Sequence, residues 1–172
     1  MELIKERCCC FTGHRILSDA EKEQLRVLLR EEMERLIEEG FTTFLSGGAL
    51  GFDTLAAQEV LRLRAERSEQ IALVLVLPCL GQESRWPAQD VDLYHEILRS
   101  ADEVIYTGDV YELGCMFVRN RYLVNRSSAC LCCLRENATR GGTAYTVRYA
   151  KKQGIEIVNL AEKLNKQSDP AF

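Results

Sequence analysis

The most constraining feature of the sequence is the alternation of short apolar runs with segments of helical periodicity from one end of the chain to the other. The apolar runs have the length of β-strands, and the run at 71–77 is continuously apolar, as expected for a strand covered on both faces. Strands that alternate with helices predict an α/β fold, a three-layer sandwich with a mainly parallel sheet and helices on both faces. We expect the strands at 7–12, 42–45, 71–77, 103–106, 128–134 and 155–158.

Two of the predicted helices carry distinct marks. The first begins at the capping-box pattern Ser18-Asp19-Ala20-Glu21 and ends at Gly40. Another is expected over 112–125, where an apolar stripe would face inward and place Asn120 on the buried side, with Arg119 one step around the helix. The stripe consists of Leu113, Met116, Phe117, Leu123 and Val124.

The length and charge of the chain limit the number of domains and the kinds of ligand that we expect. The 172 residues predict one domain over 1–165, followed by a polar tail at 166–172. A net charge of −4 argues against a protein that coats DNA or RNA, because such proteins need a basic face. The start of the chain lacks a signal-peptide pattern, and no apolar run is long enough to span a membrane, so we expect a cytoplasmic protein. The sequence is also compatible with a homo-oligomer.

Six of the eight cysteines fall in two predicted strands, at 8–10 and at 130–133. The spacing of Cys130 and Cys133 is formally that of a metal or redox site. Neighbouring strand residues point to opposite faces, however, and a Cys-x-x-Cys site usually lies on a turn. We therefore predict buried thiols that act as small hydrophobic side chains, and no metal site.

Three glycine-containing loops follow predicted strands: residues 12–15, residues 46–53 and residues 141–143. The carboxyl ends of parallel strands share one edge of the sheet, where ligands bind near a switch in strand order. Glycine allows close approach of backbone N–H groups, and a helix start offers unpaired donors, so phosphate is the expected ligand group. The residues expected to hold it are Gly13, Gly47, Gly48, Gly141, Gly142 and Thr143.

Neither glycine segment matches a known nucleotide fingerprint in full. The run Gly47-Gly48-Ala49-Leu50-Gly51 lacks the G-x-G-x-x-G spacing, and no Lys-Ser or Lys-Thr pair follows a Walker-type loop. The sequence therefore supports neither an ATPase nor a standard NAD dehydrogenase.

Several side chains near these loops are candidates for ligand contact, each beside a structural alternative. His14 either lies at the pocket edge or fills the core, and Arg15 either pairs with phosphate or is solvated. Asp53 either accepts a ribose hydroxyl or complements the helix dipole. Trp86, in the longest loop, either stacks on a base or packs on the core.

The helix over 112–125 supplies two more candidates. Arg119 either reaches the pocket or is an ordinary exposed arginine. Asn120, if buried, needs partners, which are either backbone groups near the loops or the ligand.

Taken in order, these motifs resemble the YpsA-like branch of the SLOG superfamily over about residues 7–160. The motifs are Thr12-Gly13-His14-Arg15, Ser46-Gly47-Gly48-Ala49-Leu50-Gly51-Phe52-Asp53, Pro78-Cys79 with Gln82 and Trp86, Arg119-Asn120-Arg121-Tyr122, and Gly141-Gly142-Thr143. The resemblance implies a Rossmann-like fold in a bacterial protein, related to the lonely guy phosphoribohydrolases and to DNA-processing protein A. It also implies a nucleotide-derived ligand.

One departure bears on activity. The phosphoribohydrolases carry a Gly-Gly-x-Gly-Thr-x-x-Glu loop whose glutamate is catalytic, whereas residues 141–147 here contain no glutamate. Arg119 matches the arginine of that family's helix motif. The same hydrolysis would therefore need Asp53 to replace the missing acid.

These observations leave three hypotheses. The leading one is a module that binds or senses a nucleotide derivative such as ADP-ribose or NAD, with Trp86 against the base. The second is an N-glycosidic hydrolase of nucleoside 5′-monophosphates, with Asp53 and Arg119 as the candidate catalytic residues. Asp53 would be the acid or nucleophile, because a carboxylate stabilises an oxocarbenium-like transition state, and Arg119 would position the phosphate. The third is a single-strand DNA-binding protein; the net negative charge of the chain argues against it, because such proteins bind the nucleic acid in a positively charged groove.

Overall fold

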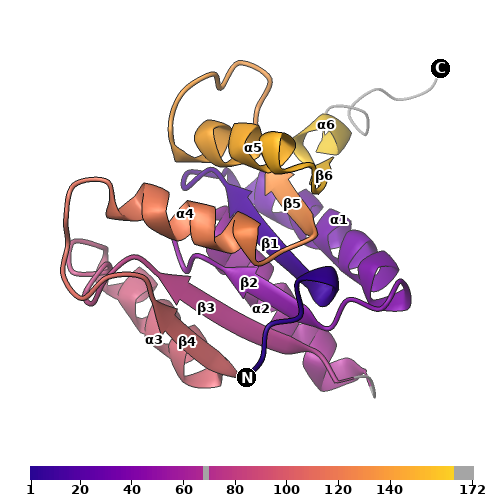
Figure 1. The fold of residues 1–172 in the computed structure, drawn as a ribbon, viewed down its shortest axis with the longest axis horizontal. Helices are drawn as coiled ribbons and strands as arrows, with labels where there is room; N and C mark the ends of the chain where they lie inside the picture. Colours follow the sequence, from indigo (N-terminus) through magenta and orange to yellow (C-terminus); the bar gives the residue numbers. More distant parts are fainter. Residues whose placement is uncertain (68–69, 165–172) are drawn as a thin grey trace.

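A computed structural model describes residues 1–67 and 70–164. It shows one six-stranded sheet in which every neighbouring pair of strands is parallel, in the order β4-β3-β2-β1-β5-β6 (Figure 1). The predicted α/β class is confirmed, and the sheet is parallel throughout. The strands are β1 (Cys8–Gly13), β2 (Thr43–Ser46), β3 (Ala72–Leu77), β4 (Glu103–Tyr106), β5 (Ala129–Cys133) and β6 (Glu156–Asn159).

The helices form two outer layers. Leucines and other apolar side chains of α1, α2 and α3 pack on one face of the sheet, and those of α4 and α5 pack on the other. The described helices are η1 (Lys5–Arg7), α1 (Asp19–Glu38), α2 (Phe52–Glu66), α3 (Ala88–Ser100), α4 (Cys115–Asn125), α5 (Gly142–Gln153) and α6 (Ala161–Leu164). Within the described ranges, no helix has the length and apolar character needed to cross a membrane.

The cysteines are divided between the two layers as predicted. Cys9 and Cys133 join the core beneath α1 and α2, whereas Cys8, Cys10 and Cys130 join the core beneath α4 and α5. All eight thiols are free and buried. The alternation of side chains along each strand explains the division.

The chain reverses its direction across the sheet beside β1. From β1 it steps outward through β2 and β3 to β4, then α4 carries it back to β5 on the other side of β1. Crossovers on opposite sides of β1 leave a crevice at the carboxyl ends of β1 and β5, the position where ligands bind in open α/β sheets.

The predicted start of α1 is confirmed. The Ser18 hydroxyl accepts the Glu21 N–H at 3.2 Å, and the Glu21 carboxylate accepts the Ser18 N–H at 2.7 Å. These two bonds satisfy donors that a helix start leaves unpaired.

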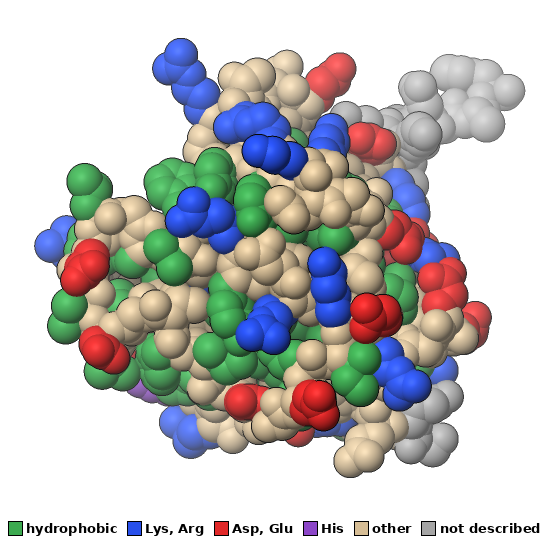
Figure 2. Space-filling model, in the orientation of Figure 1, with side chains coloured by type: hydrophobic (Ala, Val, Ile, Leu, Met, Phe, Trp, Pro, Cys, Tyr) green, Lys and Arg blue, Asp and Glu red, His purple; other side chains and the backbone are tan. Residues whose placement is uncertain are grey.

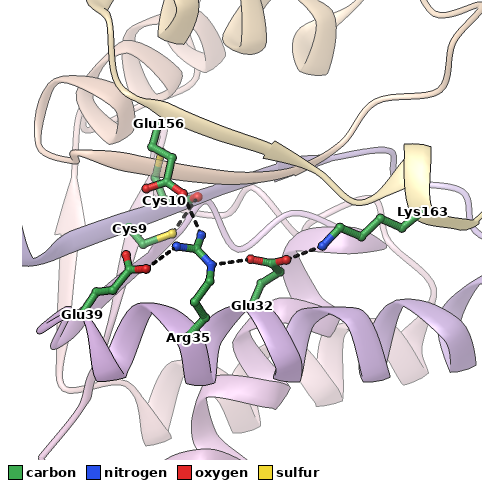
Figure 3. A network of polar contacts seen from close by, with 7 residues as sticks. All are labelled: Cys9, Cys10, Glu32, Arg35, Glu39, Glu156 and Lys163. Atoms are coloured by element: carbon green, nitrogen blue, oxygen red, sulfur yellow. Dashed lines mark hydrogen bonds and ion pairs between the residues drawn. The ribbon is translucent and has the colours of Figure 1, made fainter.

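A polar network ties α1 to β6 and α6 (Figure 3). Arg35 donates to Glu32, Glu39 and Glu156, and Glu32 also accepts from Lys163 of α6. Burial would raise the pKa of Glu32, but hydrogen bonds from Lys163 and Arg35 lower it below its usual value. The network joins β6 and α6 to α1; the predicted tail at 166–172 lies outside the described residues.

The prediction for the helix over 112–125 is wrong at its start. Gly114 adopts a left-handed conformation with a φ of 88°, and α4 begins only at Cys115. Leu113 is consequently 99% exposed in the preceding loop, and Phe117 is 43% exposed. The inward face of α4 carries Arg119 and Asn120 in addition to Leu123 and Val124, so the inward position of Asn120 is confirmed but the continuous apolar stripe is not.

Candidate functional site

A cleft of 470 Å³ lies at the carboxyl end of β1, between the starts of α2, α4 and α5. All three predicted loops contribute to it: residues 12–15, Ala49 and Asp53 from the second loop, and Gly142 and Thr143 from the third. The start of α4 and the loop before it form the remaining side. Among the residues predicted for the site, the cleft is lined by Gly13, His14, Arg15, Asp53, Arg119, Asn120, Gly142 and Thr143.

The first loop is locked against the start of α2. A Cβ on Gly13 would overlap the Phe52 side chain, and a Cβ on Gly51 would overlap the carbonyl oxygens of His14 and Arg15. The Phe52 N–H donates to the His14 carbonyl at 3.1 Å. Glycine is therefore needed at both positions for backbone packing, and Gly51 also has a φ of 78°.

The second loop turns its two adjacent glycines away from the cleft. Gly47 lies against Arg119 and Asp53, and Gly48 lies near Leu77 and accepts a hydrogen bond from Gln82 at 3.2 Å. Neither glycine lines the cleft, although both were expected to hold phosphate. They form the support beneath it.

Arg119 is held in the floor of the cleft by the second loop. Its side chain is 4% exposed and donates through Nη1 to the Gly47 carbonyl and through Nε to Asn120 Oδ1 at 2.8 Å. Burial lowers its pKa, and the charge of Asp53 opposes that effect. Because its Nε and Nη1 groups are engaged by the protein, Arg119 fixes the loop and supplies positive potential from below.

Asp53 is the buried acid of the site. Burial raises its pKa from the usual 3.8 to about 6, against the opposing effects of Arg119 and of hydrogen bonds from the backbone of Ala49 and Gly47. A carboxyl group with a pKa in this range exchanges its proton near neutral pH. The structure thus brings an acid and an arginine together beside Gly47, since a Cβ at this position would overlap Arg119 and lie 2.7 Å from Asp53 Oδ2.

His14 lies at the mouth of the cleft and faces Arg135. Its Nε2 accepts the Arg135 N–H at 3.0 Å, which requires an unprotonated Nε2. Burial and the charge of Arg135 lower the pKa of His14. His14 is therefore neutral near pH 7 and serves as an acceptor that anchors the loop after β5, while the neighbouring Arg15 is exposed.

The third loop differs from the second because it is open. Gly141, with a φ of 95°, precedes α5, and a Cβ there would meet no atom within 4 Å. A Cβ on Gly142 would approach only Asn120 Nδ2, at 3.8 Å. Gly142 and Thr143 line the cleft, and the first turn of α5 presents N–H groups that the helix itself leaves unpaired.

Trp86 lies away from the cleft. Its ring packs edge-on against Tyr94 with centroids 5.3 Å apart, and it covers the core beneath α3. The opposite wall of the cleft was not predicted from the sequence; it is made by Tyr111, Leu113, Met116 and Phe117. Gly114 could have indicated it, because a glycine at this position ends the loop before the helix and separates Leu113 from the predicted apolar stripe.

Charged and hydrogen-bonding groups therefore occupy one part of the cleft and apolar groups the other. The floor combines a buried carboxyl and a buried guanidinium, and the start of α5 supplies backbone donors beside the exposed Arg15. In residues 1–67 and 70–164, no cluster of three or more His, Cys, Asp or Glu side chains is placed to hold a metal ion. The arrangement suits an anionic group next to a less polar one.

Comparisons with known proteins agree with this fold. The model of the YspA SLOG family matches residues 11–161. UPF0398 protein BH1768 of Halalkalibacterium halodurans is 34% identical over 131 residues, which cover 75% of this chain and 68% of that protein.

Two solved structures share the fold at low identity. DNA processing protein A from Streptococcus pneumoniae superposes with a TM-score of 0.64 at 18% identity, over 88% of this chain and 49% of that chain, so this chain spans about half of it. The Helicobacter pylori protein of the same name, whose structure concerns its single-stranded DNA binding mode, has a TM-score of 0.63 at 16% identity, over 95% and 73% of the two chains. The predicted resemblance to the YpsA-like branch is confirmed, and the chain belongs to the YspA SLOG family.

Proposed function

We propose that the cleft binds a nucleotide-derived phosphate ligand, of the ADP-ribose or NAD type. The observation that carries the proposal is the convergence of an open helix start, at Gly142 and Thr143, with the exposed Arg15 in one cleft. Backbone N–H groups and the positive end of a helix favour a phosphate, and an arginine adds a charged donor. Fold membership supports a nucleotide-related role in general terms.

The buried pair beneath the cleft supports the same ligand class. Asp53 lines the cleft and has acceptor capacity beyond the two backbone N–H groups that it already binds, so it suits a ribose hydroxyl. Arg119 offsets the charge of Asp53 and adds positive potential below the phosphate. In this arrangement Arg119 is a positioning residue, and Arg15 is the arginine that contacts the ligand.

One observation favours a second function, the hydrolysis of an N-glycosidic bond in a nucleoside 5′-monophosphate. A carboxyl group with a pKa of about 6 at the floor of a cleft has the protonation behaviour of a general acid. Asp53 would then act on the glycosidic bond while Gly142 and Thr143 hold the phosphate.

The test is calorimetric titration of the wild type and of Arg15→Ala with ADP-ribose, AMP and ribose 5-phosphate, with a single-stranded oligothymidine as the comparison ligand. We expect binding of the phosphate compounds and a loss of about 1.5–3 kcal/mol in the variant, the usual value of a hydrogen bond to a charged group. Arg121→Ala, which changes an exposed arginine on α4, is the matched control.

Product analysis by mass spectrometry separates the two functions. Release of adenine from AMP by the wild type, abolished in Asp53→Asn with binding retained, would establish the hydrolase in place of simple binding. No binding of any phosphate compound, or binding of the oligothymidine alone, would contradict the proposal.

A further inference from the structure

The cleft carries a large exposed apolar surface on the side of α4. Tyr111, Leu113, Met116 and Phe117 form it, and we call these four residues the apolar wall. Leu113 is 99% exposed and Tyr111 70% exposed. Hydrophobic side chains are exposed on the left of Figure 2, over the start of α4 and the loop before it, with charged side chains among them. Exposed apolar area at the edge of a polar cleft marks a place where a ligand or partner is expected to bind.

The central ring of the wall is supported from behind by α5. Phe117 contacts Tyr145 edge to face, with centroids 4.6 Å apart and an interplanar angle of 67°. Tyr145 stacks on Tyr149 at 6.4 Å, and the Tyr149 hydroxyl donates to Asn125 Oδ1 at 2.9 Å. Three linked rings therefore join α4 to α5 and hold the partly exposed Phe117 ring in position.

Phe117 and the phosphate site belong to the same cleft and to neighbouring helix starts. Phe117 lies in the first turn of α4, and Gly142 and Thr143 lie in the first turn of α5. In Figure 1, α4 and α5 lie side by side with their starts on the same side. A ligand with an anionic end at α5 can therefore place its other end in the part of the cleft lined by Phe117.

On the basis of the proposed function, we propose that the apolar wall, centred on Phe117, is the subsite for the planar base of the nucleotide ligand. A heterocyclic base presents a flat π-face that stacks on an aromatic ring, whereas a charged phosphate has no such face. Trp86, the aromatic residue first expected in this role, is engaged with Tyr94 elsewhere. Because every base has such a face, the wall selects for the presence of a base more than for its identity.

The test compares two probes that differ by the base alone. AMP and ribose 5-phosphate are titrated into the wild type, Phe117→Ala, Phe117→Tyr and Val118→Ala. Val118 is the matched control because it is the next residue of α4, is 45% exposed and does not line the cleft. Thermal unfolding of each variant verifies that the fold is retained.

We expect Phe117→Ala to weaken AMP about tenfold, within the range for loss of one base-stacking contact, and to leave ribose 5-phosphate unchanged. Phe117→Tyr should keep AMP binding, and Val118→Ala should change neither probe. If AMP binds no more weakly to Phe117→Ala, or if both probes weaken equally, the base subsite is wrong while the phosphate site stands. If the wild type binds neither probe, the proposed function itself is wrong and the base subsite with it.

Discussion

The second and third glycine loops look alike in the sequence, since each contains two adjacent glycines in the connection from a strand into a helix, but these glycines have different roles in the structure. In the second loop, a Cβ on Gly47 would overlap Arg119 and lie 2.7 Å from Asp53 Oδ2. In the third, a Cβ on Gly141 would meet nothing, and one on Gly142 would make an ordinary contact. Glycine permits close packing of the protein on itself in the first case, and leaves the backbone accessible in the second.

A glycine-rich turn is therefore not by itself evidence of a ligand. The packed loop organises the floor of the cleft, because Gly47 and Arg119 are bonded to each other and Ser46 Oγ accepts the Gly48 N–H at 3.2 Å. The open loop is the one whose helix start, at Gly142 and Thr143, lines the cleft. Substitutions in the packed loop should therefore cost folding stability, and a substitution at Gly142 of the open loop should not. Gly141 is a separate case, because its φ of 95° is one that favours glycine.

The largest expected effect comes from Arg119→Met. The change keeps an unbranched side chain but removes the donors to the Gly47 carbonyl and to Asn120, and it leaves Asp53 buried without its cation. We expect a loss of about 3–5 kcal/mol in the free energy of unfolding, as for breaking a buried charge pair. Urea denaturation measures it, with Arg121→Met as the matched control on the same helix. Equal stability of the two variants would show that Arg119 does not support the packed loop.

A smaller change in the free energy of unfolding is expected from the titration of Asp53. Its pKa in the folded state, about 6, is above the usual 3.8, so the folded protein retains a proton that the unfolded chain has lost between these values. The stability contributed by the protonated group is present below the unfolded pKa and is lost as the pH rises through the folded pKa. The loss is about 2–3 kcal/mol, since one pKa unit corresponds to about 1.4 kcal/mol.

Asp53→Asn isolates this contribution, because asparagine does not titrate in the range. The stability of the variant relative to the wild type should therefore increase by that amount between about pH 4 and about pH 7. If the difference in the free energy of unfolding between the two proteins stays constant with pH, Asp53 has an ordinary pKa.

Gly47→Ala should destabilise the protein by about 2 kcal/mol, because an added methyl group in a tightly packed site forces its neighbours to move. Arg119 and Asp53 are those neighbours, so the substitution should also weaken ADP-ribose binding indirectly. Thermal and urea unfolding together check the stability. An unchanged free energy of unfolding would show that this loop is not tightly packed against Arg119 and Asp53.

The smallest effect is expected from Gly142→Ala, the counterpart in the open loop. The position is helical, and a Cβ there would be 3.8 Å from Asn120 Nδ2. The free energy of unfolding should change by less than about 1 kcal/mol, with stabilisation the expected sign, because alanine reduces the entropy of the unfolded chain. A loss as large as that of Gly47→Ala would abolish the distinction between the loops.

Much of the fold could be predicted from the sequence because it depends on local patterns. The alternation of apolar runs and helical segments indicated a parallel sheet covered on both faces, and Ser18 with Glu21 marked the start of α1. The meeting of residues 12–15, 46–53 and 141–143 at one cleft also follows from the pattern, because parallel strands align their carboxyl ends.

Only the tertiary structure decided which residues of the site support the cleft from below and which are accessible to a ligand. Arg119 and Arg121 are close neighbours of the same type in the same helix, yet one is buried beneath Gly47 and the other is exposed. The open third loop, the apolar wall around Phe117 and the position of Trp86 against Tyr94 likewise depend on where distant elements approach. Residue type and spacing determine which element forms, whereas the direction and accessibility of a side chain are set by contacts between residues far apart in the chain.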